Sequence, residues 1–144
     1  MKSRLLPIST LIVASLFTLP GAWAHGPEEG QEAVNILQQQ LPANAPGKKA
    51  IMLTVDYAPG QKSVAHQHPG AVMAYVLEGE VVSQLKGEQK PVTYKTGDFW
   101  YEPPGAVHLV SRNASQAKSA KLLVWILVDE QRPVTEPYQQ EGRG

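Results

Sequence analysis

Turn-forming residues interrupt this chain at short intervals from its middle onward, and this punctuation limits what it can fold into. The interruptions fall at Pro59-Gly60, Glu78-Gly79-Glu80, Lys86-Gly87, Thr96-Gly97 and Pro103-Pro104-Gly105. Most segments between them are shorter than an amphipathic helix, which usually needs ten or more residues. With 12 Gly and 12 Pro among 144 residues, the chain favours short strands joined by turns.

The segments between the turns carry the patterning of β-strands. Residues 51–57 alternate Ile, Leu, Val and Tyr with Met, Thr and Asp, which is the period of a strand with one buried face. Further strands are expected over residues 72–77, 81–85, 92–94, 98–102, 107–111 and 122–128. Seven or eight such strands predict an all-β sandwich or barrel of one domain. Residues 34–41 fit a helix or a strand.

The first 24 residues are typical of a signal peptide. Lys2 and Arg4 give a positive start, residues 5–19 are mostly apolar, and Ala22-Trp23-Ala24 is a small-x-small cleavage site. The apolar run is too short and interrupted for a comfortable membrane span, although an uncleaved anchor is the alternative. We therefore expect export, to the periplasm if the host is bacterial, and no membrane contact after cleavage.

The rest of the sequence divides into three parts. Residues 25–47 are expected to form a leader, residues 48–129 the β domain, and residues 130–144 an extended tail. Basic and acidic residues number 13 each and no basic patch stands out, so nucleic acid is not an expected partner. Because the chain has no cysteine, a metal site could use only His, Asp or Glu.

Three histidines are candidates for such a site. His66 and His68 stand two apart, so on a strand their side chains point to the same face. His108 follows the Pro103-Pro104-Gly105 corner, which is stiff because Pro fixes φ and Gly permits positive φ. Imidazole nitrogen binds Zn, Cu, Fe and Ni well, so the three rings could meet around one divalent ion.

This double pattern resembles the two motifs of the cupin superfamily, which here read Gly60, His66, His68, Gly79 and then Gly97, Pro103, Gly105, His108, with Asn113 one residue late. The resemblance covers about residues 50–128. It implies a double-stranded β-helix (jelly-roll) barrel with a divalent metal inside, whose identity among Fe, Zn, Cu, Ni and Mn stays open. Many members pair as homodimers with an N-terminal strand crossing to the partner, and residues 34–41 could play that part.

One position departs from the family pattern. Relatives commonly place a Glu ligand where this chain has Val72, and no carboxylate lies between His68 and Glu78. The site would then hold three neutral imidazoles and leave open positions for water, dioxygen or substrate. An ion that keeps its full +2 charge favours an anionic small-molecule substrate.

Glu102 is the candidate that could compensate for this departure. The resemblance suggests that it lines the barrel near the metal, as a fourth ligand or as a general base whose pKa is raised by burial. The alternative is a carboxylate at the rim, paired with Lys or Arg. Val72, Trp100 and Tyr101 are expected to form pocket walls. Asn113 is expected to be a turn residue rather than a glycosylation acceptor.

Three functions are compatible with these residues. The first is an exported metal-dependent enzyme, dioxygenase-like, that acts on a small organic acid or enol. The second is a non-catalytic module that captures a small ligand or a metal in the periplasm. The third is a barrel that holds no metal and is purely structural. A fold alone does not choose among them, because unrelated activities share it.

Overall fold

The computed structural model describes residues 29–139, and these residues form strands and turns but no helix. No helix in this part of the chain is therefore available to cross a membrane. The expected signal peptide, residues 1–24, lies outside the described residues, as do the start of the leader and the end of the tail.

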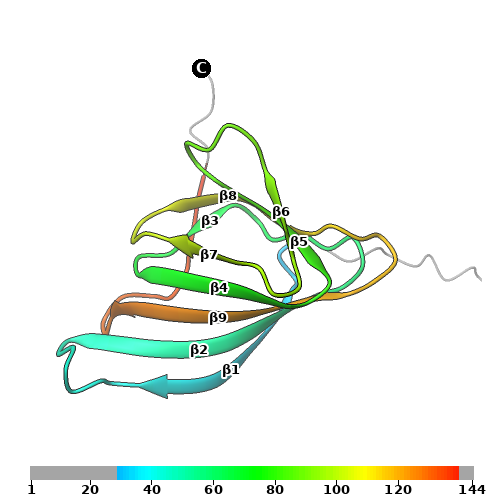
Figure 1. Cartoon of the computed structure of the whole chain (residues 1–144). Helices are drawn as coiled ribbons and strands as arrows, with labels where there is room; N and C mark the ends of the chain where they lie inside the picture. Colours follow the sequence, from blue (N-terminus) through cyan, green and yellow to red (C-terminus); the bar gives the residue numbers. More distant parts are fainter. Residues whose placement is uncertain (1–28, 140–144) are drawn as a thin grey trace, which may run out of the picture.

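The described residues form ten strands: β1 (Ala33–Gln40), β2 (Lys48–Tyr57), β3 (His66–Gln67), β4 (Ala71–Glu78), β5 (Glu80–Leu85), β6 (Val92–Lys95), β7 (Phe99–Glu102), β8 (Val107–Asn113), β9 (Ala120–Asp129) and β10 (Glu136–Pro137). The first sheet has the order β1-β2-β9-β4-β7 and the second sheet the order β10-β3-β8-β5-β6. In Figure 1 the first sheet runs from β7 down to β1, and the second sheet lies above it. The expected all-β jelly roll is confirmed.

The core lies on the inner face of the first sheet. On β9, buried and half-buried residues alternate along the strand, as expected for a strand with one face packed inward. Its buried members Leu122, Val124 and Ile126 pack with Ile51 and Leu53 of β2. These apolar side chains line the space between the two sheets, which is where the histidines also lie.

The ambiguous segment near the N-terminus is a strand. β1 pairs antiparallel with β2 of the same chain, with one irregularity between Ile36 and Gln38, and forms an edge of the first sheet. All eight of its residues are exposed, because β1 has a neighbour on one side only and extends beyond the second sheet (Figure 1). A role for this strand in crossing to a partner stays a prediction.

The C-terminal segment is more closely attached than an extended tail. Glu136 and Pro137 form β10, which pairs with β3, and the backbone N–H of Tyr138 donates to the carbonyl of Ala65 at 3.1 Å. Val134 packs against the core. The short strand β3 has an open edge, and the tail satisfies its backbone groups. Polar composition alone did not indicate this pairing.

Gly70 fits tightly between the histidine segment and β9, and we expect Gly70→Ala to destabilise the fold. An added Cβ would lie 2.3 Å from the carbonyl oxygen of Leu127 and 2.6 Å from the Cβ of Val128. Overpacking of this kind costs about 3 kcal/mol when backbone must move. Urea unfolding would measure the loss from the shift in the midpoint.

Gly47→Ala is the control, because a Cβ there meets nothing within 4 Å and only the positive φ of 75° opposes it. We expect a loss of about 1 kcal/mol at Gly47. Equal losses at the two glycines would show that the contact with β9 is not the cause.

Candidate metal centre

His66 and His68 point into the space between the sheets from β3 and the residue after it. Their ring centroids lie 4.9 Å apart, and both line the central cavity. The Nδ1 of His66 donates to the carbonyl of Val64 at 2.8 Å, and the Nδ1 of His68 donates to the carbonyl of Val134 at 2.9 Å. These bonds fix the rings in the tautomer that leaves each Nε2 free to bind a metal.

His108 is brought to the same place by strand pairing and by the turn before it. On β8 it lies directly opposite His66 of β3, and the two ring centroids are 5.2 Å apart. The N–H of Gly105, which has a φ of 77°, donates to the carbonyl of His68 at 2.8 Å. The stiff corner therefore joins the two histidine segments, as the spacing suggested.

Glu102 lies inside the barrel and not at its rim. It is 2% exposed, and on β7 it stands directly across from Val72 of β4, so both side chains face the cavity. Its Oε1 accepts a hydrogen bond from Trp100 Nε1 at 2.8 Å and lies 3.3 Å from His108 Nδ1. Its partners are thus an indole and an imidazole, and the alternative of a rim carboxylate paired with Lys or Arg is wrong.

The second carboxylate oxygen of Glu102 is buried and has no hydrogen-bond partner among the described residues. An unpaired buried oxygen of an ionised carboxylate is costly, because water no longer solvates it. The other oxygen of this carboxylate lies 3.3 Å from His108 Nδ1, and the His108 ring lies 5.2 Å from that of His66, so a cation held by the imidazoles could also satisfy Oε2. We therefore count the Oε2 of Glu102 among the possible metal ligands.

The protonation states of Glu102 and His66 suit metal binding. Burial alone would raise the pKa of Glu102, but the hydrogen bonds from His108 and Trp100 and the charges of His108 and His68 outweigh it, so the pKa is lowered. The expectation of a base with a raised pKa is therefore wrong. Burial lowers the pKa of His66 by more than its bond to Val64 raises it, so the ring is neutral. Ionised carboxylate and neutral imidazole are the forms that bind metals.

Of the three rings in the cluster, His108 is the one whose two nitrogens both have a partner. Besides its contact with Glu102, its Nε2 accepts a hydrogen bond from the buried hydroxyl of Ser83 at 2.8 Å. Within residues 29–139, no three His, Asp or Glu side chains converge closely enough to hold an ion as they stand. The donors fit a metal in kind and in burial, and small side-chain rotations would have to bring them onto one ion.

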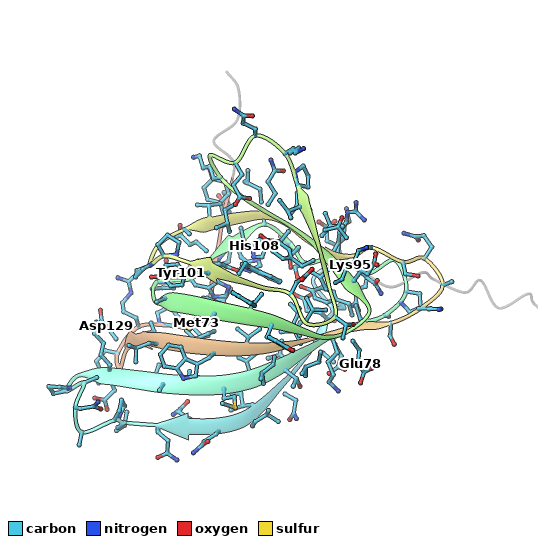
Figure 2. The ribbon with its side chains drawn as sticks, viewed as in Figure 1. Met73, Glu78, Lys95, Tyr101, His108 and Asp129 are labelled. Carbon is cyan, nitrogen blue, oxygen red and sulfur yellow. The ribbon has the colours of Figure 1, made fainter. Side chains whose placement is uncertain are left out.

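The cavity around the cluster has a volume of about 630 Å³, within the range of small-molecule sites. Its walls are mainly apolar: Leu53, Val72, Ala74, Trp100, Val124 and Ile126. Among the described residues, no Lys or Arg lines it. In Figure 2, His108 lies in the space between the sheets.

The structure places Val72 and Trp100 in the cavity wall but not Tyr101. Tyr101 is exposed and does not line the cavity, so its expected role as a pocket wall is wrong. Side chains alternate along β7, and Trp100 and Glu102 take the inward positions. Tyr101, between them, must face outward.

A second polar group in the cavity was not found from the sequence. The hydroxyl of Tyr57 bonds to Ser63 at 2.7 Å and to Ser111 at 2.8 Å, and all three residues line the cavity. Burial raises the pKa of Tyr57, so it stays a neutral phenol. The alternation of β2 placed Tyr57 inward, but no motif marks the serines or Ser83, which are common residues without a characteristic spacing.

Known proteins resemble this chain in sequence pattern and in fold. Residues 53–126, just over half of the chain, match a family model described as Cupin domain. The DMSP lyase DddQ from Ruegeria pomeroyi is similar with a TM-score of 0.59 and 21% identity, over 78% of this chain and 54% of that one. A conserved Klebsiella pneumoniae protein with a double-stranded β-helix domain gives 0.59 and 19%, over 80% and 90%.

An oxalate oxidase in complex with the substrate analogue glycolate is also similar, with a TM-score of 0.55 and 24% identity, over 74% of this chain and 55% of that one. This chain thus spans about half the length of the lyase and the oxidase. At these identities the likenesses show the fold alone. No curated protein sequence matches the chain.

Proposed function

Since this chain belongs to the cupin family, we propose that it is an exported metal-dependent enzyme that acts on a small organic acid or enol. The observation that carries the proposal is the buried Oε2 of Glu102, which has no hydrogen-bond partner within residues 29–139 and belongs to a cluster with three histidines. The lyase and the oxidase of similar fold, the latter bound to glycolate, support a small-molecule substrate.

The ion would be held by His66 and His68 through their free Nε2 atoms, by Glu102 and by His108. A divalent ion there would act as a Lewis acid for an acidic or enolic oxygen of the substrate. Elemental analysis would identify the ion among Fe, Zn, Cu, Ni and Mn. Trp100 and His108 hold Oε1 of Glu102, and so they fix the direction in which Oε2 points.

The rest of the cavity determines which substrates fit. Apolar walls exclude water and favour a hydrocarbon body, and they strengthen electrostatic interactions inside the site. No Lys or Arg of the described residues lines the cavity, so an acidic group would find its positive partner only at the metal. The hydroxyls of Tyr57, Ser63 and Ser111 would hydrogen-bond a second polar group of the substrate.

Export belongs to the proposal as well. The positive start, the short apolar run and the Ala22-Trp23-Ala24 site support delivery through a signal peptide, to the periplasm in a bacterial host. The sequence contains no cysteine, which suits an oxidising compartment because no thiol is present to be oxidised.

Elemental analysis of the purified protein tests the proposal first. We expect about one transition-metal ion per chain, since one donor cluster is present, and loss of the ion on dialysis against a chelator. Oxygen uptake and product analysis with catechols, diketones and 2-oxo acids would then identify the reaction. Activity should disappear with the metal and return when that metal is added back.

Two results would contradict the proposed enzymatic function. Protein that contains no metal and cannot be loaded with one would exclude a metal-dependent function. Metal-loaded protein that binds members of the panel without converting them would instead favour the non-catalytic binding module.

A further inference from the structure

The central cavity has a second polar region, which lies away from the histidines. Glu32 immediately precedes β1, and the pairing of β1 with β2 brings it beside Tyr57 at the end of β2. Both residues line the cavity together with Ser63 and Ser111, whose hydroxyls bond to the hydroxyl of Tyr57. We call Glu32, Tyr57, Ser63 and Ser111 the distal cluster.

Glu32 is the charged member of the distal cluster, and the cavity does not balance its charge. Its Oε2 is buried and has no hydrogen-bond partner among the described residues. Of the described residues that line the cavity, only Glu32 and Glu102 carry a formal charge at neutral pH. Lys62, next to Ser63 in the chain, bonds instead to Glu29 at 3.0 Å. A metal ion would balance Glu102, and Glu32 would then remain as the unmatched negative charge.

The distal cluster lies too far from the histidines for one ion to contact both. Ser111 follows His108 by three residues on β8, which corresponds to about 10 Å along the strand. A bond between a metal and a nitrogen or oxygen ligand is only about 2 Å long. Glu32 is therefore placed to act on the far end of a bound ligand and not on the metal itself.

The cavity is open at the distal cluster and closed at the metal centre. Val34, Ile36 and Val64 line the cavity and are 57%, 58% and 52% exposed. Val34 and Ile36 belong to β1, the edge strand that extends beyond the second sheet (Figure 1). Glu102 and His108, by contrast, are buried. A ligand would thus enter past Glu32 with its metal-binding end leading.

From these observations we infer that Glu32 binds a cationic group of the ligand, an ammonium carried on a hydrocarbon body whose other end reaches the metal. The inference rests on the proposed function, in which the metal holds the acidic or enolic end. A hydrogen bond between ionised groups is roughly twice as strong as one between neutral groups, so a cation satisfies Oε2 better than an alcohol does. A second acidic group would be repelled. The preferred substrate is therefore zwitterionic.

Calorimetric titration of the purified full-length protein with hexylammonium and with hexanol tests the inference. The two probes share one hydrocarbon body, and neither carries an acidic group for the metal. We expect hexylammonium to bind about tenfold more tightly, the effect of one charge-assisted hydrogen bond at a partly exposed site. In Glu32→Gln the two affinities should agree within about twofold, because the amide keeps the shape of the side chain but not its charge.

Glu29→Gln is the matched control, because Glu29 lies three residues away, pairs with Lys62 and does not line the cavity. It should keep the tenfold preference for hexylammonium. Equal affinities of the two probes for the wild type, or failure of hexylammonium to bind, overturn the inference. A preference that survives Glu32→Gln overturns it as well, and its loss in Glu102→Gln would then place the cation at the metal centre.

A second pair of probes separates this inference from the proposed function. On metal-loaded protein, 6-aminohexanoate should bind about tenfold more tightly than hexanoate, and this gain should disappear in Glu32→Gln. Metal content should be the same in wild type and Glu32→Gln. If neither acid bound while hexylammonium kept its preference, the cation site would stand and the metal-bound acid of the proposed function would be contradicted.

Discussion

Replacing Glu102 by Gln should weaken metal binding at least about 100-fold while leaving the fold intact. Gln keeps an oxygen that can accept the bonds from Trp100 and His108, so the change removes charge with little change in shape. At an effective dielectric constant of about 20, two unit charges about 4 Å apart attract by about 4 kcal/mol. Part of that attraction is regained by water in the variant, which leaves about 3 kcal/mol, or about 100-fold in affinity.

Competition with a fluorescent chelator would measure the affinity, and urea unfolding would check the fold. Glu32→Gln is the control, because Glu32 also lines the cavity and also has a buried oxygen for which the described part of the chain offers no partner. The charge of Glu32 raises the pKa of Tyr57, but it does not contribute to the lowered pKa of His66. Full metal affinity in Glu102→Gln together with lost turnover would make Glu102 a base and not a ligand.

The relation between Val72 and Glu102 shows how much of the site could be predicted from the sequence. The motif spacing revealed that a carboxylate was absent at Val72, and it singled out Glu102 as a possible replacement. Only the pairing of β4 with β7 shows that the two positions are direct cross-strand neighbours on the inner face. A carboxylate at position 102 of β7 can therefore reach the same side of the cavity as a carboxylate at position 72 of β4 would.

Strand parity explains why the sequence placed His66 and His68 on one face correctly and why it placed Tyr101 on the wrong face. His66 and His68 are two apart within one segment, so period-two geometry sufficed to place them on one face. Tyr101 lies two residues before the Pro103-Pro104 corner, and without the register of β7 either set of alternate residues could face inward. The position of Glu102 could not be derived for the same reason.

Contacts between distant segments were the least predictable part of the site. Ser83 meets His108 and Val134 meets His68 through pairings of β5 with β8 and of β10 with β3. No spacing marks either contact, because serine is a common residue and Val134 contacts His68 through its backbone carbonyl, which every residue has. The sequence therefore predicts the imidazoles better than the groups that orient them.

Asn113 gives the clearest case of a motif residue that serves the fold and not the metal. It is 1% exposed, and its Nδ2 donates to the carbonyls of Ala58 at 3.0 Å and of Lys118 at 2.7 Å. Its Oδ1 accepts a bond from the backbone N–H of Ser115 at 2.9 Å. Asn113 is thus the last residue of β8 and not the turn residue that was expected, and its buried amide joins the turn after β2 to the loop between β8 and β9.

Asn113→Ala should therefore lower the free energy of unfolding by about 4 kcal/mol, because three backbone groups lose their partner and each unsatisfied group costs about 1–3 kcal/mol. Urea unfolding measures this loss, and metal affinity should be unchanged in the fraction that remains folded. Gln116→Ala, an exposed change in the same loop, should stay within about 0.5 kcal/mol of the wild type. If Asn113→Ala were as stable as the wild type but bound no metal, Asn113 would belong to the metal centre. The conclusion that it serves only the fold would then be wrong.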